Sequence, residues 1–114
     1  MKTSSAKQKG RKLQQTLRDK LLEAFPELEK DDVKSTSMGA QGEDVQLSPA
    51  ARKLIPCQFE CKSRASIAVY KMYEQAATHG KDIPVLVIKE NRKEPLVVLS
   101  LDDFLKIMRV YAQV

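Results

Sequence analysis

The sequence predicts an α/β protein of one domain, in which helices flank a central mixed five-stranded sheet. Apolar residues recur every three or four positions in three segments, which is the period of an amphipathic helix. Shorter segments between these helices alternate apolar and polar residues, or are almost wholly apolar, as β-strands do. A chain of 114 residues also has enough length for one core between two packed layers.

The first part of the chain is expected to form a helix and then a short strand. Leucines at helical spacing predict a helix over residues 9–25, which ends at Pro26 because proline disfavours helical geometry in the residue before it. A short strand is predicted at 33–37. Residues 38–43 contain two glycines and are expected to form a turn or a mobile loop.

The middle of the chain is expected to add two strands joined by a short helix. Residues 44–48 alternate polar and apolar side chains, which predicts a strand. Ser48 and the proline that follows it are suited to cap and open a helical turn over 50–54. Residues 57–62 alternate again and predict the next strand.

The last part of the chain is expected to hold two helices and two strands. A helix is predicted over 63–79, with Gly80 at its C-terminus. Its apolar face is expected to contain Ser66, Val69, Tyr70, Tyr73, Ala76 and Ala77. Continuous apolar character predicts buried strands at 83–88 and 96–99. A final helix is predicted over 100–112, because its first residues resemble a capping box.

The net charge of +5 is concentrated at the N-terminus. Residues 1–12 contain five basic side chains and no acid, so the rest of the chain is neutral. Residues 1–8 are expected to form a flexible basic arm, and residues 9–114 the single domain. Such an arm suits attraction to DNA or RNA phosphates, but it is equally typical of a solubilising terminus.

The composition argues against several other classes of protein. No apolar run approaches the roughly 20 residues needed to cross a bilayer, and no apolar segment follows the N-terminal charges as in a secretory signal. The two cysteines, Cys57 and Cys61, lie too far apart along one predicted strand to form a disulfide. We therefore expect a protein of a reducing, cytoplasmic compartment without a membrane partner.

The predicted strand at 57–62 brings an acid and a lysine to one face. Strand alternation places Glu60 and Lys62 on the same side and the apolar residues on the other. Asp44 stands at the start of a neighbouring predicted strand. Two converging carboxylates can hold a hard cation such as Mg²⁺, and a lysine beside them can stabilise or deprotonate a reacting group. This constellation suits metal-assisted hydrolysis of phosphodiesters.

Each of these residues also has a plainer interpretation. Glu60 and Lys62 can form an ion pair on the surface, which would contribute at most ~1 kcal/mol to stability. Asp44 can be a turn residue that follows the glycine-containing segment. The presence of all three residues together favours the metal site over these alternatives.

The order of these elements and acids resembles that of the PD-(D/E)XK nuclease superfamily, whose fold is a restriction-endonuclease-like core. In this resemblance Asp44 takes the place of the first acid, and Glu60-Cys61-Lys62 takes the place of the (D/E)-x-K motif. The chain is most similar to the archaeal-type and phage Holliday junction resolvases. That similarity rests on the basic segment Lys9-Gly10-Arg11 and on Ser37, a serine in the loop before the Asp44 strand.

The resemblance implies a magnesium-dependent endodeoxyribonuclease. Asp44, Glu60 and the backbone carbonyl of Cys61 would bind Mg²⁺, for which Mn²⁺ would substitute. Lys62 would orient the attacking water or stabilise charge on the phosphate, and Gln75 would face the site. Contacts to DNA would come from Lys7, Lys9, Arg11, Lys12, Ser35, Ser37 and Arg64.

One position departs from the family pattern. The first helix of these nucleases carries a glutamate that helps to complete the metal site, whereas the matching position of this chain is Gln14. An amide oxygen can still orient a metal-bound water, but it brings no negative charge. Gln14 is therefore a candidate catalytic residue whose contribution differs from that of the usual acid.

The resemblance also implies partners and a cellular setting. A resolvase makes paired symmetric nicks in a four-way DNA junction, which calls for a two-fold homodimer. Such an enzyme serves DNA recombination and repair in the cytoplasm of a bacterial or archaeal cell, and is encoded by the host or by a phage. Three alternatives remain: another repair or restriction-type nuclease of the superfamily, a non-catalytic DNA-binding module of the same fold, and a plain α/β protein-interaction domain.

Overall fold

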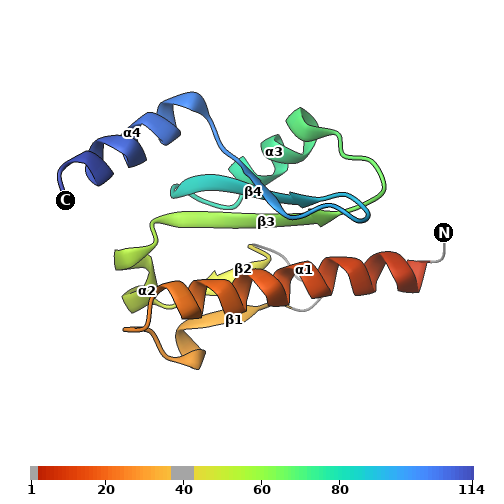
Figure 1. The fold of residues 1–114 in the computed structure, drawn as a ribbon, viewed down its shortest axis with the longest axis horizontal. Helices are drawn as coiled ribbons and strands as arrows, with labels where there is room; N and C mark the ends of the chain where they lie inside the picture. Colours follow the sequence, from red (N-terminus) through yellow and green to blue (C-terminus); the bar gives the residue numbers. More distant parts are fainter. Residues whose placement is uncertain (1–2, 37–42) are drawn as a thin grey trace.

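The structure of the protein is a computed structural model that describes residues 3–36 and 43–114. A five-stranded mixed sheet forms its centre, and helices lie on both faces of the sheet (Figure 1). In chain order the elements are α1 (Thr3–Ala24), the 3-10 turn η1 (Lys30–Asp32), β1 (Val33–Ser35), β2 (Val45–Leu47), α2 (Pro49–Leu54), β3 (Cys57–Ser63), α3 (Val69–Ala77), β4 (Ile83–Lys89), β5 (Leu96–Val98) and α4 (Leu101–Ala112). The predicted fold class is confirmed at this level.

The strands lie in the sheet in the order in which they follow one another along the chain. β1, β2 and β3 are antiparallel neighbours, and β4 and β5 form a second antiparallel pair. Between these groups β3 and β4 run parallel, in a register that extends from Cys57 and Ile83 to Ser63 and Lys89. A parallel pair requires a crossover connection, which contains α3.

Both serines that were expected to cap helices do so. The hydroxyl of Ser48 accepts a hydrogen bond from the amide of Ala51 at 3.1 Å, at the start of α2. The hydroxyl of Ser100 accepts one from the amide of Asp103 at 3.0 Å, at the start of α4. These bonds satisfy amide groups that have no partner within the first turn of a helix.

The first helix is longer than the sequence analysis predicted. α1 begins at Thr3 rather than at Lys9, so residues 3–8, expected as an arm, continue the helix. This segment contains no proline, and several of its residues have good helix propensity. Extension of an already docked helix adds one hydrogen bond for each residue that becomes ordered, so it costs little.

The crossover helix is shorter than predicted. α3 begins at Val69 rather than at Ser63, because Ser63 is still part of β3 and is paired with β4. Ser66 therefore lies outside the helix, and Tyr70 is 86% exposed instead of lying on the buried face. The residues of α3 that are buried are Met72 and Ala76.

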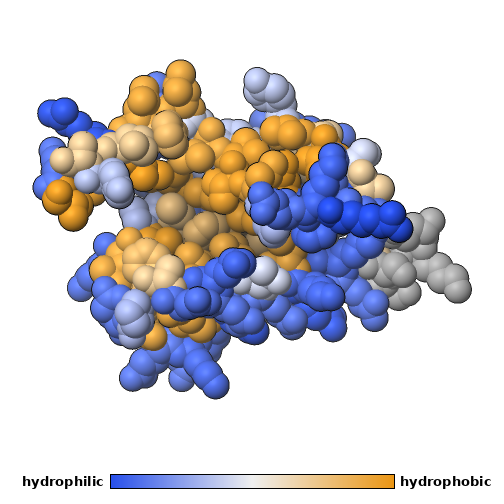
Figure 2. Space-filling view, in the orientation of Figure 1, coloured by the Kyte–Doolittle hydropathy of each residue, from blue (hydrophilic) through white to orange (hydrophobic). Residues whose placement is uncertain are grey.

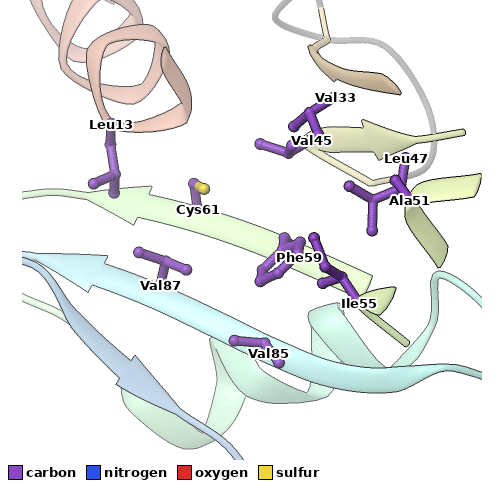
Figure 3. Close-up of a cluster of buried hydrophobic side chains, with 10 residues drawn as sticks. All are labelled: Leu13, Val33, Val45, Leu47, Ala51, Ile55, Phe59, Cys61, Val85 and Val87. Atoms are coloured by element: carbon purple, nitrogen blue, oxygen red, sulfur yellow. The ribbon is translucent and has the colours of Figure 1, made fainter. Parts of the chain in front are cut away.

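The main hydrophobic core lies between α1 and the sheet (Figure 3). Leu13 of α1 faces the side chains of β3 and β4 there, among them Cys61 and Val87. The complete cluster consists of Leu13, Val33, Val45, Leu47, Ala51, Ile55, Phe59, Cys61, Val85 and Val87. The apolar face that the alternation in β3 predicted is thus the face that meets the core.

The second face of β3 is buried as well, although its side chains are polar. Gln58 and Glu60 are 2% and 3% exposed, because α3 lies over this side of the sheet. The amide nitrogen of Gln58 donates to the carbonyls of Ala76 (3.0 Å) and Gly80 (3.3 Å). Its amide oxygen accepts from the backbone of Asp82 at 3.1 Å. Gln58 therefore ties β3 to the connection between α3 and β4.

The edge strand β5 is more exposed than its apolar sequence predicted. Leu96 and Val97 are each 57% exposed, whereas Val85, Leu86 and Val87 of the neighbouring β4 are buried as predicted. Within residues 3–36 and 43–114, no helix combines the length and apolar character that a membrane span needs.

Replacement of Gly80 with alanine should destabilise the protein by about 1 kcal/mol, because a Cβ atom there would meet the Gln58 amide oxygen at 3.0 Å. That oxygen is held by Asp82 and has little freedom to move. The measurement is the free energy of unfolding in urea, with Lys81→Ala as an exposed neighbouring control. An unchanged or increased stability would show that the Gln58 network tolerates the extra methyl group.

Candidate active site

Asp44 lies beside Glu60 at the point where β2 begins. The antiparallel register pairs Val45 with Phe59, which places the preceding Asp44 opposite Glu60. The backbone amide of Asp44 donates to the carbonyl of Phe59 at 3.1 Å. One carboxylate oxygen of Asp44 then accepts a hydrogen bond from the backbone amide of Cys61 at 2.6 Å. The side chain of Asp44 thus binds the edge of β3 just beyond the last paired residue of β2.

Glu60 is a buried carboxylate between two basic side chains. One of its oxygens lies 3.2 Å from the ammonium nitrogen of Lys62, and the other contacts the imidazole of His79. A buried carboxylate without partners would carry a large desolvation cost, which these contacts reduce. The alternation of the strand placed Glu60 next to Lys62 but allowed an ion pair on the surface, whereas in the fold both side chains are largely buried.

The carboxyl group of Asp44 is difficult to ionise in this environment. The pKa of Asp44 is raised from 3.8 to about 6, chiefly by burial and in smaller part by the neighbouring charge of Glu60. The hydrogen bond from Cys61 and the charges of Lys62 and His79 act in the opposite direction. A bound cation would favour the ionised carboxylate of Asp44. The pair formed by Asp44 and Glu60 is therefore suited to binding a cation.

The backbone of Cys61, and not its thiol, belongs to this site. Burial raises the pKa of the Cys61 thiol far above its usual range, so the thiol stays neutral in the core. The amide and carbonyl of one strand residue project to the same side of the strand. Since the Cys61 amide bonds to Asp44, the Cys61 carbonyl also projects toward the β2 side.

The oxygen atoms of Asp44, Glu60 and the Cys61 backbone are the type of ligand that a hard cation binds, although there are few of them. Two carboxylates and a backbone carbonyl are the oxygen ligands that Mg²⁺ prefers, with water in its other positions. Both oxygens of Glu60 already have basic partners, so a cation would have to share or replace one of them. The described residues contain no group of three or more His, Cys, Asp or Glu side chains placed to hold a metal.

The other predicted catalytic residues do not all gather at Asp44 and Glu60. Gln14 is buried on α1, and its amide oxygen accepts a hydrogen bond from the hydroxyl of Ser35 at 3.0 Å, which joins α1 to β1. Gln75 is exposed on α3. Ser37 lies outside the described residues, as does most of the segment at 38–43.

His79 is the side chain near Glu60 that the sequence analysis missed. In the sequence it stands before Gly80, where a cation is favourable at a helix C-terminus. In the fold its side chain is 11% exposed and reaches Glu60 from the end of α3. The contact of His79 with Glu60 could have been expected, because strands of a parallel pair are covered on both faces. A buried Glu60 then needs a basic partner from the crossover connection.

A further set of charges holds the start of β2. Arg52 of α2 forms ion pairs with Glu43 and, at 2.6 Å, with Asp82. Glu43 directly precedes Asp44, so α2 restrains the chain where it enters the site. The predicted short helix therefore has a role in positioning Asp44.

The predicted DNA-binding residues on α1 lie on a helix and not on an arm. Lys7, Arg11 and Lys12 are exposed. The ammonium group of Lys9 donates to the side-chain oxygen of Asn91 at 2.9 Å, next to the turn between β4 and β5. Arg64 is exposed directly after β3. The helix places these basic side chains at regular spacings along one element.

Comparison with protein-family models, with curated proteins and with solved structures gives no match for this chain.

Replacement of Asp44 with asparagine should stabilise the protein near neutral pH but not in mild acid. The protonated carboxyl of Asp44 contributes stability below pH 3.8, and this contribution is lost as the pH rises through its folded pKa of about 6. Asparagine keeps an acceptor for the Cys61 amide and carries no charge. We expect the variant to exceed the parent by about 1 kcal/mol at pH ~7.5, after allowance for solvent screening.

The measurement is urea unfolding at about pH 7.5 and pH 4.5, in buffers without divalent cations. The advantage of the variant should shrink toward zero at the lower pH. Asp31→Asn, at an exposed position, is the control and should change stability by less than ~0.5 kcal/mol at either pH. An equal difference between parent and Asp44→Asn at both pH values would contradict the raised pKa.

Proposed function

We propose that this protein is a metal-dependent endonuclease for branched DNA, and specifically a Holliday junction resolvase of the PD-(D/E)XK type. One observation carries the proposal: Asp44 and the Glu60–Lys62 pair are neighbours on β2 and β3. The order of α1, three antiparallel strands, a crossover helix and a parallel strand supports it. That order agrees with the restriction-endonuclease-like core that the sequence resembles.

The side chains have distinct roles in this proposal. Mg²⁺, or Mn²⁺ in its place, would supply when bound a Lewis acid for the scissile phosphate and for a water. Asp44, Glu60 and the Cys61 carbonyl are the residues that would hold the ion. Lys62 provides positive charge next to Glu60, where it can stabilise the charge that develops on the phosphate. His79 positions Glu60 from the opposite side.

The four-way junction that we propose as the substrate also calls for a homodimer. A four-way junction needs two symmetric nicks, and one domain of this size presents one set of Asp44, Glu60 and Lys62. A two-fold homodimer would bring two such sets to one branch point. The basic side chains along α1 would contact the phosphates of the junction arms.

Asp44→Asn is expected to lower cleavage of a four-way junction in Mg²⁺ by about 100-fold or more, because it removes a charged ligand at the reacting phosphate. Binding of the junction in Ca²⁺ or EDTA should change little, since the phosphate contacts lie on α1. The measurement pairs a nicking assay on a synthetic junction with a gel-shift assay. Asp31→Asn is the matched control for loss of one exposed carboxylate.

The substrate panel of this assay includes duplex, flap and single-stranded DNA of the same sequence. A resolvase should nick the junction in symmetric pairs and leave plain duplex largely intact. Equal cleavage by parent and Asp44→Asn would rule out the assignment of the site. Cleavage of duplex and junction at the same rate would support the assignment as a nuclease and contradict the assignment as a resolvase.

Removal of two basic residues of α1 should reduce the salt dependence of DNA binding. For Arg11→Ala combined with Lys12→Ala, the slope of log K against log salt should become shallower by about 2, because each phosphate contact contributes about 0.9. The measurement is fluorescence anisotropy with a labelled junction at several salt concentrations. Lys53→Ala, on the exposed side of α2, is the control. If the parent and the double variant have the same slope, Arg11 and Lys12 do not contact the DNA phosphates.

A second candidate function is a non-catalytic DNA-binding module of the same fold. Two observations favour it: Glu60 has basic partners on both oxygens, and the matching position for the third acid is Gln14. Such a module would bind junctions with the same salt dependence. It would nick none of the branched substrates in Mg²⁺ or Mn²⁺, so the same assay separates the two functions.

A further inference from the structure

The C-terminal part of the chain displays an unusual amount of apolar surface. Twelve large apolar side chains are exposed in the described part of the chain, and ten of them belong to residues 96–114. These ten are Leu96, Val97, Leu101, Phe104, Leu105, Ile107, Met108, Val110, Tyr111 and Val114. Figure 2 shows this apolar surface over α4 and the neighbouring end of the sheet. Soluble monomers rarely expose apolar patches of this extent without a binding partner.

The helix α4 projects from the body of the protein (Figure 1) and makes no extensive contact with another described element. Four polar residues, Asp102, Lys106, Arg109 and Gln113 at the C-terminal end, form one narrow stripe with spacings of four, three and four residues. Asp103 lies beside this stripe and pairs with Lys106. At about 100° per residue, the apolar side chains from Ile107 round to Leu105 occupy an unbroken arc of roughly 160°. A helix that packs on one surface needs an arc of only about 100°.

The charges of α4 are arranged so that two copies of the helix attract each other when antiparallel. Asp102 and Asp103 lie in the first turn, whereas Lys106 and Arg109 lie nearer the C-terminus. The four charges sum to zero, so identical helices are not repelled. In an antiparallel pair, Asp102 of each helix can lie opposite Arg109 of the other. A parallel pair would place like charges together instead.

This register also aligns the apolar side chains. With Asp102 opposite Arg109, the two-fold axis passes close to Leu105, so the two copies of Leu105 meet at the centre. Leu101 and Met108 flank it along the same stripe at spacings of four and three residues. Residues four and three positions apart on one helix interlock with the same pattern on a partner. The apolar stripe and the charge pattern therefore select the same arrangement.

The surface next to α4 extends the contact. A groove lined by Val69, Tyr70, Tyr73, Val98 and Leu99 continues directly to Leu101 at the start of the helix. The wide apolar arc of α4 can thus contact a second helix on one side and the body of a second copy on the other. A two-fold interface requires a surface that is complementary to itself, and this one has that property.

We propose that α4 is a dimerisation helix that packs antiparallel against α4 of a second copy, with Asp102 of each copy paired with Arg109 of the other. The proposal rests on the homodimer of the proposed function and names its interface, but it does not rest on DNA cleavage. The centre of β4 offers no such interface, because it is already buried within one chain.

The mass of the protein in solution tests this interface. The parent should sediment as a dimer, and Leu105→Glu should raise the dimer dissociation constant by about 30-fold or more, as loss of a central apolar anchor does. Lys106→Gln, on the polar stripe, is the matched control and should remain dimeric. Since Leu105 is 54% exposed, the variant is expected to fold, which circular dichroism verifies.

Charge reversal tests the antiparallel register. Asp102→Arg and Arg109→Asp should each weaken the dimer, whereas the protein with both substitutions should regain most of the affinity. A cysteine in place of Leu105 should form a disulfide between two copies under oxidation, and a cysteine in place of Lys106 should not. Failure of the double variant to recover, together with cross-linking through position 106, would reject this arrangement.

A parent protein that remains a monomer at every concentration measured would overturn the dimer itself. Loss of dimerisation and loss of chemistry are separate outcomes. Asp44→Asn should leave the dimer mass unchanged, while Leu105→Glu should leave the Asp44 and Glu60 side chains in place. A dimer that cleaves no branched DNA would thus reject the proposed nuclease and retain the interface.

Discussion

The parallel pairing of β3 with β4 constrains most of the remaining structure. Two parallel strands that follow each other in the chain need a crossover, and here the connection through α3 lies against the face of β3 that is opposite α1. This arrangement buries Gln58 and Glu60, which a strand on the surface would expose to water. Each then needs polar partners. Gln58 finds them in the backbone around Gly80, and Glu60 in His79 and Lys62.

The candidate site forms where the antiparallel half of the sheet separates from β3. β2 is short, and Asp44 leaves it while β3 continues to Ser63. The carboxylate of Asp44 then accepts the hydrogen bond of the Cys61 amide, which pairs with no strand residue among residues 3–36 and 43–114 on that side. Burial, and after it the charge of Glu60, raises the pKa of Asp44, so the start of β2 is also a position where a cation would be favourable.

The two halves of the molecule differ in how completely their surfaces are covered. α1 covers part of the core over the sheet, where Leu13 lies near Cys61 and Val87 (Figure 3). At the other edge, Leu96 and Val97 of β5 remain exposed, and α4 extends away from the sheet with its apolar side chains in solvent. The proposed chemistry and the proposed assembly therefore lie in different parts of the domain, which allows each to be altered without the other.

Local patterns determined the order of the elements, the strands, the caps at Ser48 and Ser100, and the face of β3 that meets the core. Periodicity and capping act within a few residues, so the sequence alone contains them. Tertiary structure decided the later start of α3, the burial of Glu60 and its contact with His79. These depend on which segment lies across β3, a contact between residues far apart in the chain. The acids were visible in the sequence; their surroundings were not.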